Sequence, residues 1–204
     1  MKYFPIVAVV VLALSACSHG AQQQSTSQSS PAGTYRVLLD TSRGPVVIDV
    51  DRSLAPHGAQ RFYELVRAKY FDGARFYRVV PGFVVQWGAA ASPAVTKKWD
   101  VPIPDDPVKG SNTRGTVTFA ATDEPNSRTT HLFINLGNNA RLDAMRFAPI
   151  GRVSSGMKNV DDIYPGFGEE PNQDQIAAHG NAYLEKAFPQ LDYIKTARIV
   201  DRPK

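Results

Sequence analysis

The chain of 204 residues is poor in the side chains that bind metals or form disulfides. It has 1 cysteine, Cys17, so no intramolecular disulfide can form, and its 4 histidines lie far apart in the sequence. A zinc site needs a cluster of cysteine, histidine or carboxylate ligands, so we expect no metal site. The sequence also lacks the G-x-S-x-G motif that would present a nucleophilic serine to His57, His131 or His179, which disfavours a hydrolase.

No charge of one sign dominates, and the N-terminal apolar run is too short to span a bilayer. The formal net charge is +4, and the basic residues are scattered, so the sequence does not indicate nucleic-acid binding. The apolar run covers residues 4–14, whereas a transmembrane helix needs about 20 residues. Because the run follows Lys2, it is typical of a signal peptide, which we place at residues 1–16.

The residues at the end of this run, LSAC at 14–17, resemble the lipobox of bacterial lipoproteins. The resemblance implies cleavage before Cys17 and attachment of acyl chains to it, and two chains already suffice for stable anchoring. The alternative is an ordinary secretory signal with an incidental cysteine. Ser18 stands where many lipoproteins retained in the inner membrane have aspartate. In a Gram-negative host this favours a periplasm-facing protein of the outer membrane over one of the inner membrane.

Residues 17–33 continue from the lipidated Cys17 into a tract rich in glutamine and serine. Such a tract has no apolar periodicity and cannot bury enough surface to offset its conformational entropy. We therefore expect a flexible tether, followed by a single folded domain at residues 34–204.

The pattern of the domain predicts many short strands and few helices. Alternation predicts strands at 35–39 and 46–50, joined by a turn at 42–45, and further strands within 76–86, 117–121, 131–136, 150–153 and 193–200. Apolar spacing of three and four predicts helices after Pro56, over 157–164 and over 173–188, the last capped by Asn172. Without regular βαβ alternation, this order favours an antiparallel barrel or sandwich. Packing and partner contact are both open as roles for the 173–188 helix.

The segment FYRVVPGFVVQ at 76–86 is similar, at every fixed position, to the cyclophilin signature F-x-R-x-x-P-G-F-x-x-Q. Residues 115–135 and 142–153 resemble the next two blocks of that family in order and spacing. The chain is therefore similar to the cyclophilin-type peptidyl-prolyl cis-trans isomerases. The resemblance implies a mainly β fold, a closed eight-stranded antiparallel barrel capped by two helices. The 173–188 helix is an addition near the C-terminus, and no cofactor is expected.

The same resemblance assigns the site residues. Arg78 takes the place of the catalytic arginine, and Gln86 that of the glutamine that positions the substrate backbone. The expected substrate-binding residues are Phe83, Val84, Ala120, His131, Phe133, Leu142 and Phe147.

Several positions depart from the family pattern. His131 replaces a glutamine and Leu132 replaces the aromatic residue beside it, which bears on substrate preference more than on catalysis. Arg141 falls where eukaryotic members have a tryptophan at the pocket rim, and a nearby family histidine falls on Arg146 or Phe147. Trp87 replaces a common glycine after the signature, which predicts a narrower groove floor.

The expected reaction is rotation about X-Pro peptide bonds, which breaks no bond but faces a barrier of about 18–20 kcal/mol. A guanidinium that bonds the proline nitrogen as conjugation is lost binds the transition state better than either ground state. The expected partners are proline-containing segments of exported proteins, whose folding a monomeric enzyme would assist. The alternative is a non-catalytic chaperone that binds proline segments on the same fold; retention of Arg78 argues against it.

Overall fold

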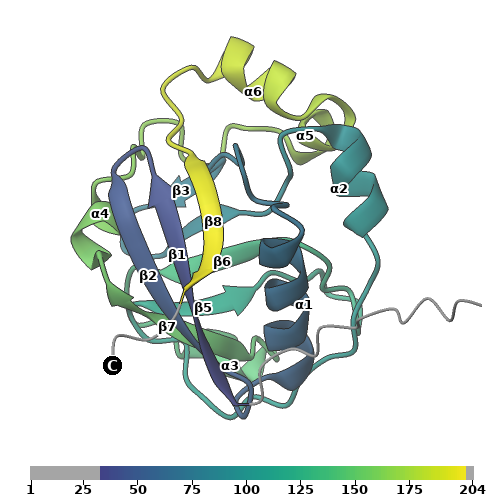
Figure 1. Cartoon of the computed structure of the whole chain (residues 1–204), viewed down its shortest axis with the longest axis vertical. Coiled ribbons are helices and arrows are strands. Elements are labelled where there is room, and N and C mark those ends of the chain that lie inside the picture. Colours follow the sequence, from purple (N-terminus) through teal and green to yellow (C-terminus); the bar gives the residue numbers. More distant parts are fainter. Residues whose placement is uncertain (1–32, 201–204) are drawn as a thin grey trace, which may run out of the picture.

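The computed structural model describes residues 33–200, which are built around one eight-stranded antiparallel sheet (Figure 1). The predicted signal peptide, Cys17 and the tether up to residue 32 lie outside the described residues. Within 33–200, no helix combines the length and apolar character needed to cross a membrane. The strands are β1 (Thr34–Thr41), β2 (Gly44–Asp51), β3 (Arg78–Val80), β4 (Val84–Trp87), β5 (Thr116–Phe119), β6 (Leu132–Asn135), β7 (Pro149–Ser155) and β8 (Ile194–Val200).

The predicted strands are confirmed, with ends that differ by a few residues. Alternation along β1 and β2 turns Val37 and Ile48 inward, where both side chains are fully buried. The core inside the curled sheet also contains Phe62, Phe119 and Trp87. The order of the strands across the sheet is β3-β4-β6-β5-β7-β2-β1-β8.

The prediction of a closed barrel overstates the pairing of the two edge strands. β3 and β8 lie at opposite ends of the strand order and do not pair with each other. At this seam, the segment before β3 is bonded to β8 in place of β3 itself. The Gly73 amide donates to the Ile194 carbonyl, and the Ile194 amide donates to the Ala74 carbonyl, both at 2.8 Å. The chain then leaves β8, and the Val79 amide bonds the Gly168 carbonyl instead. The sheet is thus a curled half-barrel.

The predicted helices after Pro56 and around 157–164 form α1 (Pro56–Arg67) and α4 (Met157–Asp161), which pack against the curled sheet on different sides (Figure 1). Pro56 stands in the first turn of α1, where its missing N–H costs no hydrogen bond. Two further helices, α2 (Pro93–Trp99) and α3 (Arg141–Ala144), were not predicted. α2 buries no residue and α3 has four residues, so neither has an apolar stripe that periodicity can detect.

The predicted helix over 173–188 is divided into α5 (Gln173–His179) and α6 (Asn181–Ala187). Gly180, with φ +56°, ends α5 and begins α6. The predicted cap is present, because the Asn172 side chain accepts a hydrogen bond from the Gln175 amide at 3.0 Å. Ile176 and Leu184 turn inward and form a second, smaller core with Tyr77. Of the two roles left open for this segment, the structure shows packing.

Close approach of β2 and β7 requires glycine at position 151. A methyl group on Gly151 would collide with the Asp49 carbonyl oxygen and come within 2.8 Å of Val50 Cα, both backbone atoms of β2. We expect Gly151→Ala to lower the free energy of unfolding by about 1–3 kcal/mol. Gly110→Ala is the matched control, because no atom lies within 3.8 Å of its added methyl group.

Urea unfolding followed by circular dichroism measures both variants. Equal stability of Gly151→Ala and Gly110→Ala would contradict the assigned β2–β7 spacing.

Candidate active site

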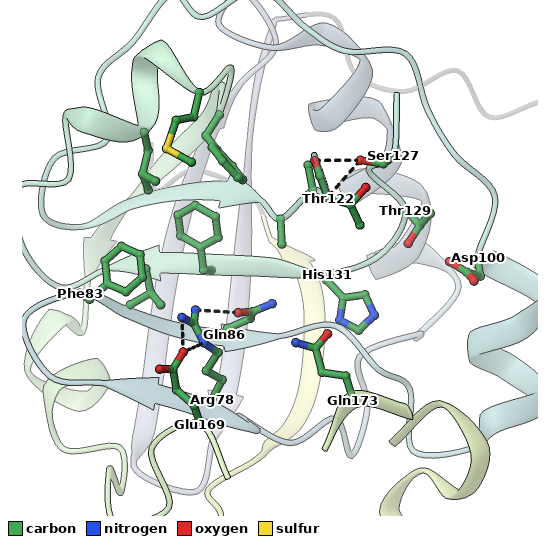
Figure 2. Close-up of a pocket in the computed structure, with 17 residues that line it drawn as sticks. Arg78, Phe83, Gln86, Asp100, Thr122, Ser127, Thr129, His131, Glu169 and Gln173 are labelled. Carbon is green, nitrogen blue, oxygen red and sulfur yellow. Dashed lines mark hydrogen bonds and ion pairs between the residues drawn. The ribbon is translucent and has the colours of Figure 1, made fainter. Parts of the chain in front are cut away.

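A groove of about 690 Å³ is lined by residues of β3, β4, β6 and the loops beyond them (Figure 2). Alternation along β4 decides which side chains reach it. Val84 and Gln86 face the groove, whereas Val85 and Trp87 join the barrel core. Within the described residues, no group of three or more histidine, cysteine or acidic side chains could hold a metal ion.

Arg78 lies at the wall of the groove, opposite Gln86 in the pairing of β3 with β4. Its Nη1 donates a hydrogen bond to Gln86 Oε1 at 3.1 Å. Its Nε donates to Glu169 Oε1 at 2.6 Å, and Nη2 lies 2.5 Å from the same oxygen (Figure 2). The Cζ atom is 5.4 Å from the centre of the Phe83 ring. The structure therefore brings the predicted pair Arg78 and Gln86 together, and adds Glu169, which the sequence did not indicate.

An apolar pocket adjoins this arginine. Val84, Phe133 and Leu142 form a buried cluster separate from the barrel core. The partly buried side chains around it are Phe83, Ala120 and Phe147. The Phe133 and Phe147 rings meet edge to face with centroids 5.9 Å apart. All seven predicted substrate-binding residues line one groove, since His131 also faces it.

Buried asparagines hold the loops that carry the pocket residues. Asn112 Nδ2 donates to the Asp143 carboxylate at 2.7 Å and to the Phe147 carbonyl at 2.8 Å. Asn139 Nδ2 donates to the Phe83 carbonyl at 2.9 Å. Because buried polar groups must find partners, these amides fix where the pocket wall lies. Sequence reasoning assigned neither of them a role, and no periodic pattern marks a buried amide.

The prediction that Trp87 narrows the groove floor is wrong. Its side chain is fully buried on the core side of β4, where the indole meets Phe71 and Phe76 at centroid distances of 6.3 and 5.9 Å. The residue after Gln86 points away from the groove because strand side chains alternate. At the predicted rim position, Arg141 is exposed, and its Cζ lies 4.7 Å from the centre of the Phe83 ring.

His131 lines the groove, whereas Arg141 does not. Its Nδ1 forms a 2.8 Å hydrogen bond with the Tyr77 hydroxyl. Burial disfavours the charged imidazolium and lowers the pKa of His131, an effect that the negative charge of Asp100 opposes. Tyr77 is also buried, and burial raises its pKa above the ordinary value. The groove thus presents a neutral imidazole where the family pattern has a glutamine.

Family comparison agrees with this geometry. The family model for cyclophilin type peptidyl-prolyl cis-trans isomerase/CLD matches residues 36–180. The chain belongs to the cyclophilin-type peptidyl-prolyl cis-trans isomerases. The matched residues include strands β2 to β7 and most of β1, and they end before β8.

Relatives of this cyclophilin carry the same activity. It is 34% identical over 163 residues to peptidyl-prolyl cis-trans isomerase A of Dickeya dadantii, covering 78% of this chain and 83% of that protein. It is 30% identical over 135 residues to peptidyl-prolyl cis-trans isomerase B of Escherichia coli, covering 62% and 82%. These identities support isomerase activity, so the chain is an enzyme.

Solved structures show the same fold. A cyclophilin type isomerase of Cryptosporidium parvum superposes with a TM-score of 0.62 at 18% identity, covering 83% of this chain and 99% of that one. The same protein has also been solved in the presence of the dipeptide Ala-Pro, with a TM-score of 0.61 against this chain, 18% identity and coverage of 82% and 99%.

The lowered pKa of His131 predicts a pH-dependent loss of stability. An unfolded histidine titrates near pH 6.5, whereas the folded one stays neutral at lower pH. Below about pH 6.5 the unfolded state therefore binds more protons, and stability falls until the folded histidine is also protonated. His131→Gln removes this contribution. We expect the variant to lose less of its melting temperature than the wild type between pH 7.5 and 5.0.

Thermal melting at both pH values, with the same buffer ions, measures the difference. An identical loss in both proteins would rule out His131 as the responsible group.

Proposed function

We propose that this cyclophilin isomerises X-Pro bonds of exported proteins in the groove beside Arg78, while a lipid on Cys17 holds it at the bacterial envelope. The supporting observation is the placement of one permanent cation at the edge of a buried apolar pocket. The Arg78 guanidinium lies beside Phe83 and bonds Gln86, and Val84, Phe133 and Leu142 lie in the same groove. The apolar pocket is suited to a proline ring. The guanidinium is suited to donate a hydrogen bond to the proline nitrogen, which becomes an acceptor as the peptide bond rotates.

The chemistry explains why such a pair of features accelerates the reaction. In the twisted transition state the proline nitrogen loses its conjugation with the carbonyl and becomes a hydrogen-bond acceptor. A donor placed there stabilises the transition state but neither the cis nor the trans ground state. Arginine suits this task because it stays charged and its planar fork offers several donors in fixed directions. Gln86, bonded to that fork at 3.1 Å, also lines the groove, where it would bond a substrate backbone.

The envelope location is proposed from the sequence around Cys17. The motif LSAC at 14–17 follows an apolar run, and a polar tract separates it from β1, which begins at Thr34. Such a tract would keep the groove away from the lipid surface. Proline-containing segments of proteins crossing the periplasm would be the substrates. The outer membrane is proposed over the inner one because Ser18 is not an aspartate.

Replacing the arginine tests the catalytic assignment. Arg78→Ala should lower kcat/KM for an Ala-Pro tetrapeptide by two or more decades, which is about 3 kcal/mol of transition-state stabilisation. Affinity for a proline peptide should change much less, because the apolar pocket remains. Arg78→Lys should recover only part of the rate, since lysine keeps the charge without the planar fork. A protease-coupled assay measures the rates.

Arg36→Ala is the matched control for this experiment. Arg36 has a side-chain exposure of 21%, against 25% for Arg78, and it also pairs with a carboxylate, that of Asp49. It lies on β1, away from the groove. If folded Arg78→Ala retains the rate of Arg36→Ala, Arg78 is not catalytic, and the groove binds proline without using this cation.

Replacing the cysteine tests the anchor. Cys17→Ser should abolish incorporation of labelled palmitate and move the protein from the membrane fraction to the soluble fraction of the envelope. Since lipid chains alone provide the anchor in this proposal, isomerase activity per molecule should not change. Equal labelling of wild type and variant would contradict the lipoprotein assignment, and density fractionation of the labelled wild type would separate outer from inner membrane.

A further inference from the structure

Glu169 contacts the arginine on which the proposed function depends. One carboxylate oxygen, Oε1, accepts from Arg78 Nε at 2.6 Å and lies 2.5 Å from Nη2. The two residues are 91 positions apart in the chain. The contact therefore exists only because the segment from Tyr164 to Leu191 folds back against β3.

Backbone contacts place this carboxylate. The Val79 amide, next to Arg78, donates to the Gly168 carbonyl, next to Glu169, at 3.1 Å. Gly168 has φ +49° and its amide closes a turn onto the Pro165 carbonyl at 2.9 Å. The turn and the strand edge together bring residue 169 beside residue 78. The backbone therefore positions both side chains for the ion pair.

Aromatic packing stabilises the turn at residues 165–168. Phe167 meets Phe188 and Tyr164 at ring-centroid distances of 5.1 and 5.4 Å. Phe188 belongs to the small second core with Ile176 and Leu184 of α5 and α6. Figure 1 shows both helices beyond the end of the curled sheet, apart from α1. The second core thus supports the loop that carries Glu169.

The pattern of donors shows what Glu169 can do for Arg78. A guanidinium has five N–H donors. Glu169 accepts a hydrogen bond from Nε and lies in ion-pair contact with Nη2, and Gln86 accepts a hydrogen bond from Nη1. At least one N–H on each terminal nitrogen is left for a substrate. Two anchors on different edges restrain the rotation of a long side chain, which orients the remaining donors before substrate binds.

We propose that Glu169 is a positioning residue for the isomerase reaction, which holds the Arg78 guanidinium in a fixed orientation beside the proline pocket. The proposal rests on the catalytic role of Arg78. Since a misplaced catalytic group loses rate while the pocket still binds proline, removal of Glu169 acts on kcat and leaves KM nearly unchanged.

The chain offers a closely matched control in Glu185. This residue, on α6, pairs with Arg75 at 2.9 Å and has a side-chain exposure of 56%, against 62% for Glu169. Both ion pairs join the same C-terminal segment to the strand region before or within β3. Only Glu169 lines the groove. Glu185→Ala therefore reports what the loss of a docking ion pair does by itself.

The experiment compares kcat, KM and melting temperature of Glu169→Ala, Glu169→Gln and Glu185→Ala, each in the full chain. We expect Glu169→Ala to lower kcat roughly tenfold with KM within about twofold of wild type. Glu169→Gln keeps an acceptor oxygen without the charge and should lose less, since a charge-assisted bond is roughly twice as strong as a neutral one. Glu185→Ala should keep the wild-type kcat.

A double variant separates this inference from the function on which it rests. In Arg78→Ala, the further change Glu169→Ala should have no effect on the remaining rate, because the group that it positions is gone. If Arg78→Ala alone retains full activity, the catalytic assignment of Arg78 fails. If Arg78→Ala is slow but Glu169→Ala keeps or exceeds the wild-type kcat, only the positioning role is overturned. An equal loss of kcat in Glu169→Ala and Glu185→Ala would likewise overturn it, in favour of simple docking.

Discussion

The division of side chains along β4 and β6 determines both the core and the site. Every residue of these two strands is buried, although neither is covered by a second sheet. Val85 and Ile134 point into the barrel, while Val84 and Phe133 point outward under α3 and the loop that follows it. A shift of register by one residue would exchange the two sets and would place Gln86 in the core. The packing of the core therefore fixes the strand register that places the groove side chains. A variant that disturbs the packing of the core should also shift the groove side chains.

Much of this arrangement could be predicted from the sequence, because it depends on local patterns. Alternation indicated the strands, and the fixed positions of the signature at 76–86 brought Arg78, Phe83 and Gln86 into one site. The family comparison confirms the isomerase, and the groove contains all the predicted catalytic and substrate-binding residues. Local patterns do not predict whether the two edges of the sheet pair and close it into a barrel. β3 has three residues, and whether its free edge meets β8 or another segment depends on contacts far along the chain.

The features that the sequence did not indicate share that dependence on distant contacts. Asn112 and Phe147 are 35 positions apart, and their hydrogen bond has no counterpart in the periodicity of either segment. The split of the 173–188 helix follows from Gly180, whose position cannot carry a side chain without approaching the Ala91 carbonyl and Pro93. Trp87 was assigned to the groove because a glycine is common there in the family, while alternation from Gln86 points to the core. For Trp87, strand alternation therefore predicted the position of the side chain correctly, and the family comparison did not.

The edges of the curled sheet have a consequence for the behaviour of this protein among unfolded chains. An exposed strand edge offers a row of unpaired amides and carbonyls to which another polypeptide can add as a further strand. β3 is short, and the amide of its central residue, Val79, is already bonded to Gly168, while the start of β8 is bonded to residues 73–74. Much of the backbone at the seam between the two edge strands is thereby occupied. Because these groups are already bonded within the chain, the seam offers few free amides and carbonyls to which an extended polypeptide could add, and this disfavours aggregation through these two edges.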